Sequence, residues 1–572
     1  MLNTDDVYHD DDYYLDEYLK LMSSNSIDVN LMIKKGFPPP WVKINKFYNL
    51  LNHHDKHNRN ISLKNIKLSF PGLTLIDDSN LTLSYGTKYG LIGRNGTGKT
   101  SLLNYILNQK YYSIHVVEQM CFPENVPVID YLLSTDKERE WLIKTKTLLE
   151  SNDYNTYALH YDINDIHQRL SEIKSDSSHS KASAILFGLG FNKNEIDKPL
   201  NNFSGGQRMI ISLASALFIE PNILMLDEPT NHLDIYAIAW LENYLKNIFK
   251  GTLLVISHNK DFLNNVADCI IHLHMKKLTL YQCNYYKFEQ QRIINKKINN
   301  DKYDKYIKEE KKLKKLLNDP KNNNSSNAKK KLSKLQKVEM DVDEKKYELL
   351  FPKPDNIGFP ILQFKNVTFK YEDKIILKNV DFGFDLNSKI GLVGRNGSGK
   401  TTLIKLMNKE IDPNIGEVWL NRKLKISKFD QHNISSLPQN ITPLEHLKII
   451  FKETNDQIIR SHLSKSGIYG KLQTKNISFL SGGQKARLSF ACITYNNPHL
   501  LFLDEPTNHL DMESINSLSK SLKEFKGGFM LITHDKYILS EVCNEIWLIN
   551  NKFITKYHQP FDDYFNNMLV NQ

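Results

Sequence analysis

The stretch ILMLDEPTNHLD at residues 223–234 recurs almost unchanged as LLFLDEPTNHLD at residues 500–511. The two copies begin 277 positions apart in a chain of 572 residues. Each opens with four apolar residues, continues with two acids and then reaches a Pro-Thr turn. A short apolar run that ends in turn residues is typical of a buried strand. The sequence therefore predicts, twice, a buried strand with adjacent acids at its end.

Three further motifs repeat in the same order, which indicates that one large unit occurs twice. They are GRNGTGKT and GRNGSGKT at 93–100 and 394–401, FSGGQ and LSGGQ at 203–207 and 480–484, and VISHNKDFL and LITHDKYIL at 255–263 and 531–539. We expect an α/β fold with two tandem domains. The expected boundaries are an acidic N-terminal extension at 1–60, domain 1 at 61–286, a linker at 287–357, domain 2 at 358–566 and a tail at 567–572.

The two units differ in the length of one segment. Gln119 and Ser204 are 85 residues apart, whereas Gln431 and Ser481 are only 50 apart. The first unit therefore holds 35 additional residues before its SGGQ motif. The segment around 131–181 is polar, lacks glycine and has the composition of helix. We expect a helical arm there.

Composition excludes several classes of protein. Hydrophobic residues make up 40% of the chain, enough for several cores, and no apolar run approaches the roughly 18 residues needed to span a bilayer. The five cysteines are scattered without a CxxC pair, so neither a disulfide framework nor a metal cluster is indicated. The N-terminus has no signal-type apolar core, and we expect a cytoplasmic protein.

The pattern GxxxxGK[ST] after a short apolar strand predicts a phosphate-binding loop. Its glycines allow backbone N–H groups to converge on phosphates, its lysine supplies charge, and its threonine can ligate magnesium. Two copies, each between a strand and a helix, indicate two sites for a nucleotide and Mg²⁺. The expected contacts are Gly93, Arg94, Asn95, Gly96, Thr97, Gly98, Lys99, Thr100 and Ser101 in the first loop, and Gly394, Arg395, Asn396, Gly397, Ser398, Gly399, Lys400, Thr401 and Thr402 in the second.

The acids after the quoted strands suit the same chemistry. Asp227 and Asp504 are expected in the magnesium shell, and Glu228 and Glu505 are expected to orient and polarise an attacking water. A strand end followed by a turn does not by itself require two adjacent acids beside a phosphate loop. We therefore expect both glutamates to be catalytic.

The SGGQ motif opens a helix, whose N-terminus presents free N–H groups and a positive dipole to an anion. Because each unit already has its own phosphate loop, we expect each SGGQ to cap the γ-phosphate held by the other unit. The residues concerned are Ser204, Gly205, Gly206 and Gln207, and Ser481, Gly482, Gly483 and Gln484.

Taken together, these motifs resemble those of ABC-type ATPase domains, and two such domains on one chain without a membrane span resemble the ABC-F family. The resemblance covers about residues 61–566. It includes the glutamines in VVEQM and KFDQH and a histidine downstream of each NHLD motif. HVVEQM, ASAILFGLGF, AIAWLENYL and IIHLH are most similar to the eukaryotic branch of general amino acid control, and similar also to a neighbouring branch in ribosome biogenesis. The resemblance to the ABC-F family implies that two ATP molecules bind between two domains arranged head to tail.

The resemblance also implies roles for six further residues. Gln119 and Gln431 would join the magnesium shell, and His258 and His534 would contact the γ-phosphate, although either histidine alone is more often an ordinary strand-end residue. Phe70 and Tyr371 would stack on adenine. Both lie 23 residues before the first loop glycine, yet a lone aromatic at a strand end is core about as often.

The linker is the most basic part of the chain. Residues 287–337 hold 17 Lys or Arg and 6 Asp or Glu, a net charge of +11 in a chain whose total is +10. We expect a helical hairpin whose first helix, of about 32 residues, reaches roughly 48 Å. A solvated spacer is the alternative to a phosphate-backbone partner. In ABC-F proteins the corresponding linker enters the ribosome beside tRNA, which favours rRNA and tRNA as partners.

These observations predict a monomeric cytosolic ATPase that binds ribosomes and acts in translation or its regulation. The alternatives are the ATP-binding subunit of a membrane exporter with a separate channel, a ribosome-biogenesis ATPase and a DNA-maintenance ATPase. The last class usually carries longer coiled coils or zinc cysteines, and five scattered cysteines exclude the iron–sulfur recycling ATPases. In the branch of general amino acid control an N-terminal region recruits a partner, so the resemblance implies a translation-control protein partner for the N-terminal extension at 1–60, which is acidic in its first 20 residues.

Overall fold

A computed structural model gives the fold. It describes residues 42, 60–70, 73–108, 114–116, 125–150, 162–317, 333, 349–430, 432–453, 455–508 and 510–557.

The first half contains a six-stranded sheet with the order β4-β5-β6-β3-β7-β8. Its strands are β3 (Lys88–Ile92), β4 (Ile114–Val116), β5 (Ile223–Asp227), β6 (Thr252–Ile256), β7 (Cys269–His274) and β8 (Lys277–Tyr281). Strands β3 and β6 are buried at every position, as expected for parallel strands covered on both faces. Strand β8, which pairs antiparallel with β7, has a largely exposed pattern.

The second half repeats this sheet strand for strand, in the order β13-β14-β15-β11-β16-β17. The strands are β11 (Lys389–Gly394), β13 (Ile426–Phe429), β14 (Leu500–Asp504), β15 (Gly528–Ile532), β16 (Glu545–Asn550) and β17 (Phe553–Tyr557). Again the last strand is antiparallel and its neighbours are parallel. The identical order confirms two tandem copies of one α/β unit.

Each half also carries a small antiparallel sheet. In the first half it consists of β1 (Ile61–Phe70) and β2 (Leu73–Leu83), and in the second of β9 (Leu362–Tyr371), β10 (Lys374–Phe384) and β12 (Ile415–Leu420). The second of these sheets encloses, with β11 and the helix α15 (Lys400–Met407), a core that includes Phe364, Val380 and Leu403.

Helices fill the chain between the strands. In the first half they are α4 (Lys99–Leu107), α5 (Val128–Thr135), α6 (Lys137–Glu150), α7 (Ile163–Glu172), α8 (Ser178–Gly188), α9 (Lys193–Ile196), α10 (Gly205–Ile219), α11 (Ile235–Asn243) and α12 (Lys260–Val266). Helices α6 and α7 lie within the predicted arm, where Arg169 forms an ion pair with Glu138 at 2.8 Å. Their apolar side chains, Leu142 and Ile166, form a small core that includes Val42.

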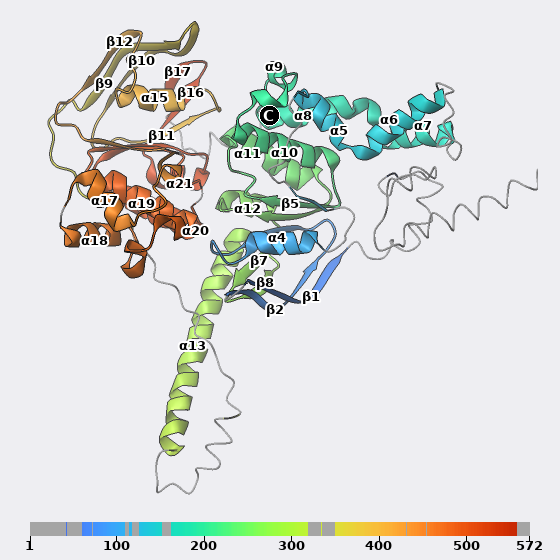
Figure 1. The fold of residues 1–572 in the computed structure, drawn as a ribbon, viewed down its shortest axis with the longest axis horizontal. Coiled ribbons are helices and arrows are strands. Elements are labelled where there is room, and N and C mark those ends of the chain that lie inside the picture. The colour runs from blue at the N-terminus through green and yellow to red at the C-terminus, as the bar shows by residue number, and fades with distance from the viewer. Residues whose placement is uncertain are drawn as a thin grey trace, which may run out of the picture. The chain divides into compact units, whose positions relative to one another are not determined.

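The second half has α16 (His432–Ser435), α17 (Pro443–Phe451), α18 (Asp456–Lys465), α19 (Gly482–Thr494), α20 (Met512–Glu524) and α21 (Lys536–Val542). Figure 1 shows α17, α18 and α19 side by side, and Leu447, Leu463 and Leu488 are buried in their common core. Helix α17 begins at a capping box between Thr442 and Glu445 with a proline at its first turn, a strong start signal.

The linker begins with α13 (Tyr285–Leu317), a single helix of 33 residues that Figure 1 shows in yellow-green. Of the second helix of the predicted hairpin, residue 333 is described and is helical, and the rest lies outside the described residues. Near the far end of the predicted linker, residues 349–351 pack on the second half. There Leu349 is buried, Leu350 N–H donates to the Lys465 carbonyl at 3.0 Å, and Phe351 meets Phe525 edge to face.

Candidate functional site

Both phosphate loops leave a central strand of their sheet and run directly into a helix. The first follows β3 and enters α4, and the second follows β11 and enters α15. Gly98 and Gly399 have φ values of 102° and 108°, in the left-handed region that favours glycine. A Cβ atom at Gly399 would lie 2.7 Å from Ile376 Cγ2, whereas one at Gly397 would meet nothing within 4 Å. The loop is thus tight on its protein side and open where phosphates would approach.

The loop lysines are held inside their own loops. Lys99 Nζ donates to the Gly93 carbonyl at 2.7 Å, and Lys400 Nζ donates to the Gly394 carbonyl at 2.6 Å. Both side chains are buried. Each ammonium therefore already lies in the centre of a loop whose backbone N–H groups bind phosphate. This is the position from which a lysine reaches β- and γ-phosphate oxygens.

The predicted magnesium residues come together in pairs in both halves. Thr100 Oγ1 donates to Asp227 at 2.7 Å, and Thr401 Oγ1 donates to Asp504 at 2.9 Å. Burial raises the pKa of Asp504, against the opposing effects of the Thr401 hydrogen bond and the Lys400 charge. A buried carboxylate beside a hydroxyl is an environment that a bound cation would stabilise.

These residues fit Mg²⁺. The ion is usually held by one or two carboxylates together with substrate phosphates and water, and it prefers oxygen ligands. In the described part of the chain no group of three or more His, Cys, Asp or Glu side chains is placed to hold a metal by itself. A hydroxyl and one carboxylate per loop are therefore the part that the protein would supply to an Mg²⁺ that arrives with ATP.

The two predicted catalytic glutamates share an unusual backbone conformation. Glu228 and Glu505 follow β5 and β14 directly, and both have φ of 50°. A non-glycine residue at positive φ is uncommon and costs about 1–3 kcal/mol, which persists where the surrounding structure fixes it, often at active sites. The Glu505 N–H donates to the Ile532 carbonyl at 2.9 Å, which fixes the turn. The same strained turn occurs in both copies.

The two predicted γ-phosphate histidines are both neutral but have different partners. His258 Nε2 lies 3.1 Å from Asn95 Oδ1, and His534 Nε2 lies 3.0 Å from Glu505 Oε1. Burial, aided by the Lys99 charge, lowers the pKa of His258 to about 4. Burial and the Lys400 charge lower the pKa of His534 well below its usual value. Neutral imidazoles can donate a hydrogen bond to phosphate without carrying a charge of their own.

The SGGQ motifs are helix N-termini, as predicted. Ser204 and Ser481 are the N-cap residues of α10 and α19, and each forms a capping box with the glutamine three positions later. A Cβ atom at Gly205 or Gly482 would meet nothing within 4 Å, so the backbone there is open. That each of these helix starts serves the nucleotide of the other half stays a prediction from the sequence.

Two pairs of predicted residues remain. Phe70 and Tyr371 end β1 and β9 and are 58% and 45% exposed, which leaves their rings accessible. Their role in adenine stacking stays a prediction. Gln119 and Gln431 lie outside the described residues.

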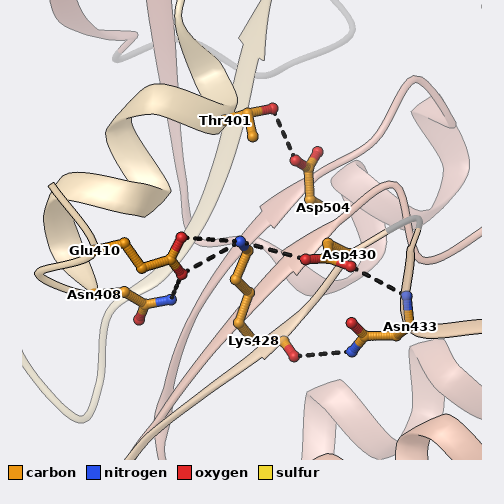
Figure 2. Close-up of polar contacts among 7 residues, drawn as sticks. All are labelled: Thr401, Asn408, Glu410, Lys428, Asp430, Asn433 and Asp504. Carbon is orange, nitrogen blue, oxygen red and sulfur yellow. Dashed lines mark hydrogen bonds and ion pairs between the residues drawn. The ribbon is translucent and has the colours of Figure 1, made fainter. Parts of the chain in front are cut away.

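A charged cluster beside the second site was not singled out in the sequence. Lys428 Nζ lies 3.3 Å from Glu410 Oε1 and 3.3 Å from Asp430 Oδ2, next to the Thr401–Asp504 pair (Figure 2). Comparing the two copies of the repeat could have identified Lys428. Counting back three residues from Gln431 gives Lys428, whereas counting back three from Gln119 gives Val116. A lysine in place of valine, in the strand before the glutamine, marks the position.

Comparison with known proteins agrees with this geometry. A family model described as ABC transporter matches residues 76–231 and 377–508. ABC transporter F family member 4 of Dictyostelium discoideum is 39% identical over 532 residues, 89% of this chain, and this chain spans 46% of that relative's length. ABC transporter F family member 3 of Arabidopsis thaliana is 36% identical, over 88% of this chain and 75% of its own length. This chain belongs to the ABC-F family.

The fold also resembles a solved structure. A complex of the archaeal ribosomal stalk protein aP1 with the archaeal ribosome recycling factor aABCE1 contains a chain that matches with a TM-score of 0.54, at 17% identity. The match covers 85% of this chain and 89% of that one. At this identity the likeness concerns the fold alone. It is the fold of two tandem ABC ATPase domains.

Membership of the ABC-F family, the two preformed phosphate loops and the paired Asp-Glu strand ends identify the chain as an ATPase. ABC ATPase domains imply that the protein binds nucleotide. That each half binds it with its own lysine, threonine, aspartate and glutamate stays a prediction. In the described part of the chain, no helix combines the length and the hydrophobicity needed to cross a membrane.

Proposed function

We propose that this ABC-F ATPase binds ribosomes in the cytoplasm and couples MgATP binding and hydrolysis to translation or its regulation. The observation that carries the proposal is α13, a long basic helix with an exposed surface. Over residues 285–317 it holds 11 Lys or Arg and five Asp or Glu. None of the side chains from 289 to 312 is buried.

A helix of this kind is not explained by packing within its own domain. Its side chains from 289 to 312, which include the exposed Ile293, Ile294 and Ile298, are not covered by the rest of the described chain. At 33 residues, α13 extends about 50 Å. Lys305, Lys308, Lys312 and Lys315 are exposed and spaced three or four residues apart, so they lie on one face. Such a row of lysines suits the phosphate backbone of RNA.

The first turn of α13 is held rigidly by its neighbours. The helix can therefore present its lysine face in a fixed direction. Phe288 is 1% exposed and packs against the rings of Tyr281 and His272, at centroid distances of 4.9 and 5.2 Å. Tyr285 is also buried in this group. The Tyr286 hydroxyl donates to Asp261 on α12. The strands β7 and β8 and the helix α12 thus anchor the first turn of the linker.

The ribosome is the partner that matches these features. Its surface offers dense phosphate, and phosphate contacts position a protein without reading sequence. The fold neighbour whose name is ribosome recycling factor, in a complex with a ribosomal stalk protein, supports this partner class. A monomeric state, contact with tRNA and a translation-control partner for residues 1–60 belong to the same proposal.

The experiment is ribosome co-sedimentation of a variant in which Lys305, Lys308, Lys312 and Lys315 are all replaced by Gln. The Glu228→Gln and Glu505→Gln substitutions are present throughout so that the ATP-bound complex persists. Each lost phosphate contact should reduce the slope of log affinity against log salt by about 0.7 to 0.9. We expect weaker binding and a shallower salt dependence.

A matched control removes four exposed lysines elsewhere in the same half. Replacing Lys193, Lys198, Lys276 and Lys277 by Gln changes the net charge equally. If both variants bind ribosomes like the parent at every salt concentration, α13 is a solvated spacer and the proposal is wrong. Recovery of the parent protein with membranes rather than ribosomes would favour the exporter alternative.

A further inference from the structure

The charged cluster around Lys428 lies where three parts of the second nucleotide site meet. Lys428 is on β13, which pairs in parallel with β14, the strand that ends at Asp504. Glu410 lies three residues beyond the end of α15, the helix that starts at the phosphate-loop lysine. Asp430 directly precedes Gln431. The side chain of Lys428 is 18% exposed, whereas those of Asp430 and Glu410 are 26% and 41% exposed, so the ion pair with Asp430 is the better shielded of the two.

The same cluster continues towards the helix that starts at the second SGGQ motif. Asp430 Oδ1 accepts a hydrogen bond from the Asn433 N–H at 3.1 Å, while its other oxygen faces Lys428. Asn433 Nδ2 donates to the Lys428 carbonyl at 3.2 Å, and the Asn433 carbonyl accepts from Ser489 Oγ of α19 at 3.2 Å. Figure 2 shows Glu410, Lys428, Asp430 and Asn433 in one continuous chain of contacts.

Without its ammonium group the cluster would be electrostatically unfavourable. Glu410 and Asp430 both approach Lys428 Nζ within 3.3 Å, so two carboxylates converge on one point. Like charges at such separation repel strongly where solvent screening is weak. With an apolar residue at position 428, the two acids would have to move apart. Asp430 would then no longer be held in its place beside the Thr401–Asp504 pair.

We propose that Lys428 is a positioning residue of the second ATP site, which holds Asp430 and Glu410 in place beside the Thr401–Asp504 pair, where Mg²⁺-bound nucleotide is expected. The first site has Val116 at the matching position and Glu118 at the position of Asp430, so it lacks this ion pair. The two halves therefore differ in sequence at this position, and in the second half the ion pairs of Lys428 are already formed without nucleotide. This inference concerns the ATPase alone and is independent of ribosome binding.

The test measures nucleotide binding rather than turnover, one site at a time. Lys99→Ala leaves only the second site competent, and Lys400→Ala leaves only the first. In each background, the affinity of full-length protein for a fluorescent ATP analogue is titrated with Mg²⁺ and again with EDTA. Removing a residue that orients metal ligands typically lowers metal affinity by about 10- to 100-fold. We expect Lys428→Val to weaken Mg²⁺-dependent binding at the second site by at least about tenfold.

Three comparisons separate positioning from a general structural defect. Lys428→Val should leave binding in EDTA, and binding at the first site, close to the parent values. Lys428→Arg, which can form both ion pairs, should restore Mg²⁺-dependent binding. Lys425→Val, which removes an ion pair to Asp355 at 3.7 Å a few residues away, should have no effect.

Asp430→Asn provides a second route that keeps the shape of the side chain and its acceptor for the Asn433 N–H. It should weaken the same Mg²⁺-dependent nucleotide binding at the second site. The double variant Lys428→Val, Asp430→Asn should lose less binding free energy than the two single variants lose in total. Equal losses with Mg²⁺ and EDTA, equal losses at both sites, or parent-like binding by both single variants would each overturn the proposal.

Discussion

His534 Nε2 lies 3.0 Å from Glu505 Oε1, and each of the two side chains is only 12% exposed. Burial raises the pKa of Glu505, with Lys400 opposing this effect, and burial lowers the pKa of His534. The predicted catalytic acid and γ-phosphate histidine of the second site are thus in direct contact, and both favour their neutral forms. In the first half, His258 contacts Asn95 instead. The two sites differ in their contacts as well as in the lysine at position 428.

Replacing both predicted catalytic glutamates should trap the protein with ATP bound. Glu228→Gln with Glu505→Gln keeps the shape of each side chain and removes the group that polarises water. Loss of a catalytic acid or base typically lowers the rate by about 10²- to 10⁴-fold. We expect steady-state phosphate release to fall within that range while ATP-analogue affinity is retained. Turnover near that of the parent would show that other groups activate the water.

Glu505→Gln alone should make the nucleotide-free protein more stable at alkaline pH. Because the pKa of Glu505 is raised in the folded state, the folded state binds more protons than the unfolded one above the ordinary value of 4.5. The stabilising effect of the protonated form is therefore lost as pH rises through the raised pKa. In thermal melts, the melting temperature of the variant should be higher than that of the parent at pH 8. This difference in melting temperature should shrink towards pH 5. A difference that is constant with pH would contradict the raised pKa.

His258→Gln should show the opposite dependence on pH. The pKa of His258 falls from 6.5 to about 4 on folding, so between these values the unfolded state binds more protons. Stability that the neutral histidine confers is complete above pH 6.5 and is lost as pH falls towards 4, by up to about 1.4 kcal/mol per pH unit. Melting temperatures of parent and variant should converge, or cross, on going from pH 7 to pH 5. Parallel curves over this range would indicate an unshifted histidine.

Gly188→Ala should destabilise the first half through overpacking. A Cβ atom at Gly188, the last residue of α8, would lie 2.1 Å from Trp240 Cε2. Trp240 is stacked on Tyr244 at 5.2 Å, which limits how far its ring can retreat. Overpacking of this kind costs about 1–3 kcal/mol, to be measured by denaturant unfolding. Gly358→Ala is the control, because a Cβ atom there meets nothing within 4 Å; equal stability of the two variants would contradict the close contact.

The amino-acid sequence by itself determined the repeat, the nucleotide motifs and the strands that carry them. Phosphate loops and Asp-Glu strand ends can be read in this way because their chemistry depends on a few adjacent residues. The capping boxes of Ser204 and Ser481 are local for the same reason, since each involves only the glutamine three residues later. The long basic helix was also predicted, because its composition excludes a buried position.

The tertiary structure decided what depends on residues far apart in the chain. The order of the six strands and the packing of residues 349–351 on the second half arise from pairings across tens of residues. The charged cluster joins Glu410 to Lys428 across 18 residues, and strand pairing places it beside Asp504. Hydrophobic periodicity reports which face of an element is buried but not which element covers it. Lys428 illustrates the difference. In the sequence it is one lysine among many, and only the parallel pairing of β13 with β14 places it beside Asp504.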